Sequence, residues 1–95
     1  MYKIGQQKKD GKVRVEFICE NSAGHTVMVA GSFNDWAPVP MSFDSAANHS
    51  AVAFKLNPGY YEYRFIVDGE WITDESNPAV SANDFGTLNS VLKLQ

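Results

Sequence analysis

The stretch Tyr60–Trp71, YYEYRFIVDGEW, constrains the fold more than any other part of the sequence. Aromatic or aliphatic residues occupy every second position from 61 to 67, which is the period of a β-strand with one buried face. Asp68 and Gly69 can both adopt positive φ, so a two-residue hairpin turn should follow this strand. The pattern therefore predicts an inward aromatic row, with Arg64 on the outer face and Trp71 just beyond the turn.

Short strand patterns also occur along the rest of the chain, separated by turn residues, and no helical period of useful length appears. This arrangement predicts a single all-β domain over residues 1–95, built as an antiparallel sandwich. The Ala79–Gly86 segment has no clear period and predicts no strand. In the last strand we expect Leu88, Leu92 and Leu94 to face inward. The other expected strands are residues 2–7, Lys12–Glu20, His25–Gly31, Met41–Phe43 and Ala51–Leu56.

The composition narrows the classes of partner. A hydrophobic fraction of 44% and a charged fraction of 20% are ordinary for a soluble globular domain. The net charge is −3, and the acidic residues dominate after residue 14, so binding a nucleic acid through that part would be repulsive. The sequence has no membrane-length apolar run and no signal core, which predicts a cytoplasmic protein that does not contact membranes. Cys19, the only cysteine, lies in register with apolar strand positions and predicts a buried thiol.

Trp36, Arg64, Trp71 and Asn89 form the first candidate site. Sugars present flat apolar faces rimmed by hydroxyl groups, and their receptors combine large rings for stacking with planar polar groups. Both tryptophans follow turn residues, which suits exposure, but tryptophan is mostly buried on average. The pattern alone leaves two interpretations open for each ring, a sugar platform or ordinary core.

Catalysis and metal binding have little support in the sequence. The carboxylates Asp68, Glu70, Asp74 and Glu75 cluster on one predicted hairpin and the loop after it, whereas glycosidases place two carboxylates across a cleft. Asp68 is also explained by the turn itself. The two histidines and the cysteine lack metal-ligand spacing. We therefore predict no catalytic residue, no metal and no cofactor.

Three motifs carry a resemblance to a known family: Val29–Trp36 (VAGSFNDW), Pro58–Trp71 (PGYYEYRFIVDGEW) and Gly86–Val91 (GTLNSV). Together they resemble the glycogen-binding domain of AMP-activated protein kinase β subunits, which is carbohydrate-binding module family 48. The similarity runs from about residue 13 to residue 94. It implies an immunoglobulin-like sandwich of the early-set kind that binds α-1,4-glucans such as glycogen, starch and maltooligosaccharides.

The resemblance also implies roles for individual residues. Trp36 and Trp71 match rings that stack on glucose, and Arg64 stands where the family often has lysine. Phe85 takes the place of a protruding leucine. Further hydroxyl contacts are implied for Thr87 and Asn89. The alternative function is that of an interaction module that docks to a glucan-metabolising enzyme or to a kinase complex, with a vestigial sugar site; the intact pair of tryptophans argues against it.

Overall fold

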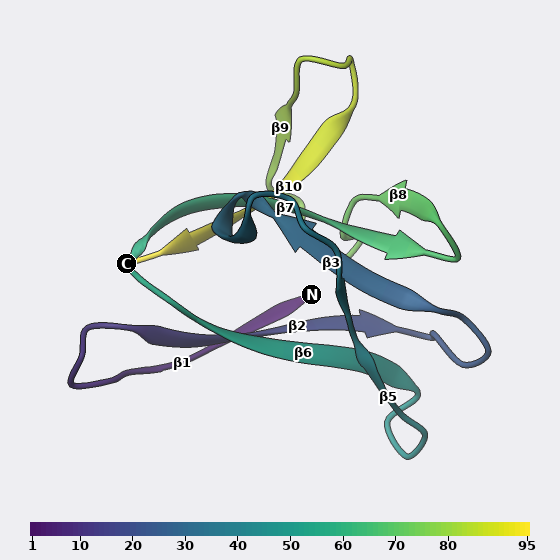
Figure 1. The fold of residues 1–95 in the computed structure, drawn as a ribbon, viewed down its shortest axis with the longest axis horizontal. Helices are drawn as coiled ribbons and strands as arrows, with labels where there is room; N and C mark the ends of the chain where they lie inside the picture. Colours follow the sequence, from purple (N-terminus) through teal and green to yellow (C-terminus); the bar gives the residue numbers. More distant parts are fainter.

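Two antiparallel β-sheets face each other in a computed structural model that describes all of residues 1–95 (Figure 1). The first sheet has the order β1-β2-β6-β5, from Tyr2–Gln7, Val13–Glu20, His49–Leu56 and Ser42–Asp44. The second has the order β4-β3-β7-β10-β9, from Val39–Pro40, Val27–Gly31, Gly59–Val67, Leu88–Leu94 and Val80–Ala82. A further strand, β8 (Glu70–Ile72), pairs with β7. The predicted all-β sandwich is confirmed.

The inner faces of the strands supply the core, as the two-residue period predicts. Tyr63 and Phe65 of β7 are 0% and 2% exposed, and Phe17 of β2 meets Tyr63 with ring centroids 4.9 Å apart. Leu92 of β10 is fully buried in the same cluster. Because these rings come from both sheets, they fix how the second sheet lies on the first. The outer face of β7 is thereby presented to solvent or ligand.

Only one helical element is present, the 3-10 turn η1 (Ser32–Asn34), and the protein has no helix with the length and apolarity needed to cross a membrane. Phe33 in this turn stacks on Phe17 at 5.3 Å. Its ring lies so close to Gly31 that a Cβ there would come within 2.2 Å of it. A glycine is therefore required before the turn, and the buried Phe33 anchors the loop that follows.

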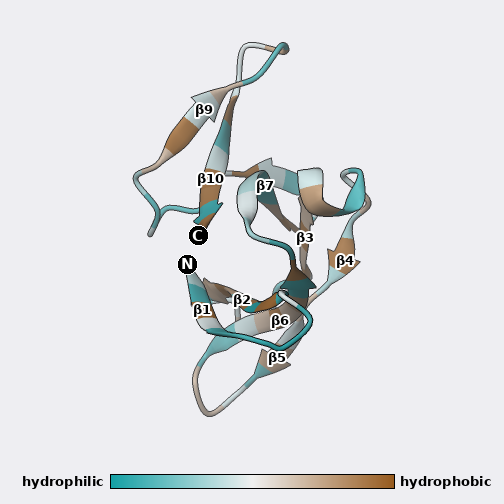
Figure 2. Ribbon diagram, turned by 90° about the vertical axis from the view of Figure 1, so that its left-hand side faces the viewer, coloured by the Kyte–Doolittle hydropathy of each residue, from teal (hydrophilic) through white to brown (hydrophobic).

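The hairpin formed by β9 and β10 differs from the sequence prediction. Residues Val80–Ala82 form a strand although they show no clear period, and the hairpin extends away from the two sheets (Figures 1 and 2). Leu88 is 47% exposed, so the prediction that it faces inward is wrong, while Leu92 and Leu94 are buried. Leu88 has the same parity as its buried neighbours but lies on the part of β10 that projects beyond the other sheet.

Candidate functional site

The β7–β8 hairpin places Trp71 and Arg64 on the same outer face. Asp68 and Gly69 have φ values of 51° and 86°, as the expected turn requires. Trp71 is paired directly with Ile66, and Arg64 lies two residues along β7 on that face. The Arg64 Nη2 atom donates a hydrogen bond of 2.7 Å to the carbonyl oxygen of Trp71, whose residue is 41% exposed. The predicted outward position of both side chains is confirmed.

The Arg64 guanidinium retains donors that the protein does not use. Its Nε atom is buried and has no hydrogen-bond partner. A buried donor without a partner is costly, and an incoming oxygen acceptor removes that cost. Arg64 therefore braces the β8 backbone with one nitrogen while another is left for a ligand.

Trp36 is held by a tight turn after η1. Asp35 and Trp36 both have left-handed backbone conformations, with φ of 55° and 61°, which is uncommon for a bulky residue. The Asn34 side chain braces the turn by donating to the Ala37 carbonyl at 2.8 Å and accepting from the Gly31 amide at 3.2 Å. Strained backbone of this kind is often found at binding sites. The structure leaves Trp36 only partly buried.

The loop between β9 and β10 completes the site. Phe85, at its tip, is 91% exposed, while Asn89 at its base is 7% exposed. The Asn83 side chain holds the loop together through four hydrogen bonds, to the amides of Phe85 and Thr87, to the Thr87 hydroxyl and to Asn89. On the other side, the Asn89 amide nitrogen donates to Glu62 of β7 at 3.3 Å.

All six of the residues predicted for sugar binding line one groove of about 550 Å³. They come from three separate parts of the chain: the turn after η1, the β7–β8 hairpin and the β9–β10 loop. Asn83 and Asp84 also line the groove, and our reading of the sequence missed both. The only signal for Asn83 was its place before the loop that carries Phe85. The lining residues are Trp36, Arg64, Trp71, Asn83, Asp84, Phe85, Thr87 and Asn89.

Neither Asp68 nor Glu70 nor the other two carboxylates of the acidic cluster line this groove. Asp68 instead ties the β7–β8 turn to the loop before β3, accepting from the Thr26 amide at 2.9 Å and pairing with the His25 ring. The hydrogen bond from His25 and then that from the Thr26 amide lower the pKa of the Asp68 carboxyl. These contacts give Asp68 a structural role, in agreement with the sequence interpretation.

The lowered pKa of Asp68 predicts a pH-dependent contribution to stability. Because the folded-state pKa lies below the ordinary value of about 3.9, this contribution is complete above that value and is lost as the pH falls through the folded-state pKa. The wild type should therefore unfold at a higher temperature than Asp68→Asn at pH 6, and the gap should narrow below about pH 4. Thermal melts of both proteins from pH 6 to pH 2 check this. A gap that stays constant would contradict it.

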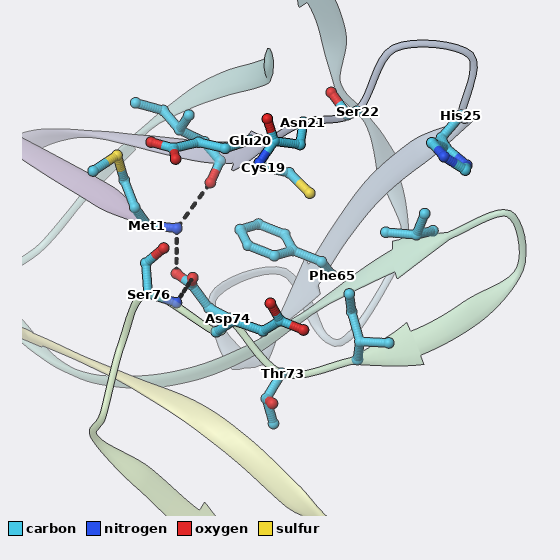
Figure 3. Close-up of a pocket in the computed structure, with 14 residues that line it drawn as sticks. Met1, Cys19, Glu20, Asn21, Ser22, His25, Phe65, Thr73, Asp74 and Ser76 are labelled. Atoms are coloured by element: carbon cyan, nitrogen blue, oxygen red, sulfur yellow. Dashed lines mark hydrogen bonds and ion pairs between the residues drawn. The ribbon is translucent and has the colours of Figure 1, made fainter. Parts of the chain in front are cut away.

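A second cavity, of about 290 Å³, lies at one end of the sandwich (Figure 3). Asp74 in its wall is 3% exposed and accepts from the Tyr63 hydroxyl at 2.7 Å and from the Ser76 amide at 3.0 Å. It also pairs with the Met1 ammonium, which donates to the Ile18 carbonyl. Cys19 is half-buried there, and burial raises the pKa of its thiol. The cavity thus holds a satisfied carboxylate and an unactivated thiol.

Comparison with known proteins identifies the family. Residues 13–95 match the family described as the glycogen recognition site of AMP-activated protein kinase. The chain belongs to this glycogen recognition family. It is 33% identical over 88 residues to the AMP-activated protein kinase subunit beta-1 of Sus scrofa, which covers 93% of this chain and 70% of that protein. It is also 30% identical over 89 residues to human subunit beta-2, covering 93% of this chain and 32% of that protein. The resemblance seen in the motifs is confirmed.

The glycogen recognition domain also has a counterpart of known structure. A maltogenic amylase from S. marinus matches the whole chain with a TM-score of 0.79 and 23% identity, over 16% of the amylase chain. At this identity the match supports the fold alone. Most of the relatives are considerably longer than this chain, which spans 26% of human subunit beta-1.

Proposed function

We propose that this chain is a non-catalytic module that binds α-1,4-glucans, such as glycogen, starch chains and maltooligosaccharides. The observation that carries the proposal is the single groove that collects two partly exposed tryptophans, an arginine with an unused donor and a polar loop. Trp36 and Trp71 would stack on glucose rings, and Phe85 would project into the curve of the glucan. Arg64, Thr87 and Asn89 would bind hydroxyl groups. Membership of a glycogen recognition family supports this assignment.

The affinity should be modest. Stacking on aromatic rings is favourable, but each sugar hydroxyl must lose water before it bonds to the protein. We expect a Kd for maltoheptaose between about 1 μM and 1 mM, which corresponds to roughly −8 to −4 kcal/mol. A longer polysaccharide offers many such sites along its chains and should retain the protein more strongly.

Electrophoresis in native gels that contain glycogen tests the proposal. The wild type should migrate more slowly as the glycogen concentration rises, and added maltoheptaose should restore its mobility by competition. Unchanged mobility at the highest glycogen concentration would contradict glucan binding. Retention on one protein partner without any dependence on glucan would instead favour the docking module considered above.

The setting of the module follows from its relatives. They are named as subunits of AMP-activated protein kinase, and we infer that this domain serves as the glucan-binding part of a comparable cytoplasmic assembly. Co-purification of a kinase subunit with the native protein would support that inference.

A further inference from the structure

We propose that Asn83 is a positioning residue that sets the direction of the hydrogen bonds in the groove, so that Thr87 and Asn89 offer donors to a bound glucan. This inference rests on the proposed function and specifies how that groove recognises sugar hydroxyls. Asn83 lies at the start of the β9–β10 loop and is half-buried. It contacts both polar residues of the loop that line the groove.

The loop backbone fixes one end of the Asn83 amide. The Oδ1 atom accepts from the backbone amides of Phe85 at 3.0 Å and Thr87 at 3.2 Å. Only an oxygen can accept these two bonds, so the Nδ2 group must lie on the other side. There it donates to the Thr87 hydroxyl oxygen at 2.7 Å and to Asn89 Oδ1 at 3.1 Å. Both hydrogens of the Asn83 amide are thereby used inside the protein.

Glu62 fixes the same arrangement from the opposite side. Its carboxylate accepts from the Asn89 Nδ2 atom at 3.3 Å. Because a carboxylate has no hydrogen to donate, Asn89 must turn its amide nitrogen to Glu62 and its oxygen to Asn83. The requirements of the carboxylate and of the loop backbone therefore agree on one orientation for both amides.

This orientation determines what the groove offers to a ligand. The Thr87 hydroxyl oxygen already accepts from Asn83, so its own hydrogen is free to point toward a ligand. Asn89 has one remaining N–H on the nitrogen that faces Glu62. The Arg64 side chain can only donate. The polar groups around the groove are thus biased toward donors, and the sugar hydroxyl oxygens are bound mainly as acceptors.

Asn83→Asp separates the shape of the loop from the direction of its hydrogen bonds. Aspartate keeps an oxygen for the amides of Phe85 and Thr87, but it replaces both donated hydrogens with a second acceptor. The Thr87 hydroxyl would then donate to the new carboxylate instead of the ligand, and Asn89 Oδ1 would face another oxygen. Calorimetry should show an affinity for maltoheptaose at least tenfold lower than that of the wild type. Asn48→Asp, in the exposed turn before β6, adds the same charge and should bind within twofold of the wild type.

Amide NMR spectra distinguish positioning from loss of the loop. In Asn83→Asp the backbone amides of Phe85 and Thr87 should keep their hydrogen-bonded chemical shifts, while the side-chain NH2 signals of Asn89 should move. Binding by Asn83→Asp within twofold of the wild type would overturn the inference. So would a variant whose Phe85 and Thr87 amide shifts collapse, because the role would then be structural only. A wild type that does not bind maltoheptaose would instead overturn the proposed function, which this comparison with Asn83→Asp cannot do by itself.

Discussion

Replacing Trp71 with alanine should lower the affinity for maltoheptaose at least tenfold, a loss of about 1.4 kcal/mol or more. The ring is 41% exposed and lines the groove, so its removal takes away a stacking surface from the ligand. The fold should survive, because the side chain lies outside the core cluster between the sheets. We expect the free energy of unfolding to fall by no more than about 1 kcal/mol.

Phe43→Ala is the matched control for Trp71→Ala. Phe43 is an aromatic residue with 46% exposure, but it lies in β5 of the other sheet and does not line the groove. Calorimetry with maltoheptaose should give the wild-type affinity for this variant. The role assigned to Trp71 would be wrong if Trp71→Ala bound normally, and its ring would be structural if the variant unfolded.

Replacing Asp74 with alanine should cause the largest loss of stability. Its carboxylate accepts hydrogen bonds from the Tyr63 hydroxyl and the Ser76 amide inside the protein. The substitution leaves the Tyr63 hydroxyl without its acceptor and creates a small cavity. We expect the free energy of unfolding to fall by about 2–4 kcal/mol, which lowers the Tm by roughly 10 °C or more.

Glu75→Ala serves as the control for Asp74→Ala, because Glu75 is an exposed carboxylate next in the chain. Its Tm should stay within about 3 °C of the wild type. Thermal and urea unfolding of both variants measure the difference. Equal stability of the two variants would show that the buried hydrogen bonds of Asp74 contribute little.

Local patterns in the sequence were enough to predict the β7–β8 hairpin. The two-residue period decides which side chains of β7 face the core, and Asp68-Gly69 decides where the chain reverses. Both are properties of neighbouring residues, so they need no knowledge of the rest of the fold. The outward positions of Arg64 and Trp71 follow directly from them.

Features that depend on tertiary contacts were beyond such patterns. Leu88 continues the parity of Leu92, and only the extension of β10 beyond the first sheet shows that it is exposed. Asp74 seemed to belong to an acidic surface cluster, yet it meets Tyr63 from a distant strand. The importance of Asn83 depends on contacts with Thr87 and Asn89 that form only when the β9–β10 loop closes.

The central claim is that the groove between Trp36, Trp71 and Phe85 holds an α-glucan, and titration calorimetry of the wild type with maltoheptaose tests it most directly. We predict saturable binding of one oligosaccharide per chain, with a Kd between about 1 μM and 1 mM. The absence of any binding heat at several temperatures, with maltoheptaose raised to roughly ten times the upper limit of that range, would contradict the claim.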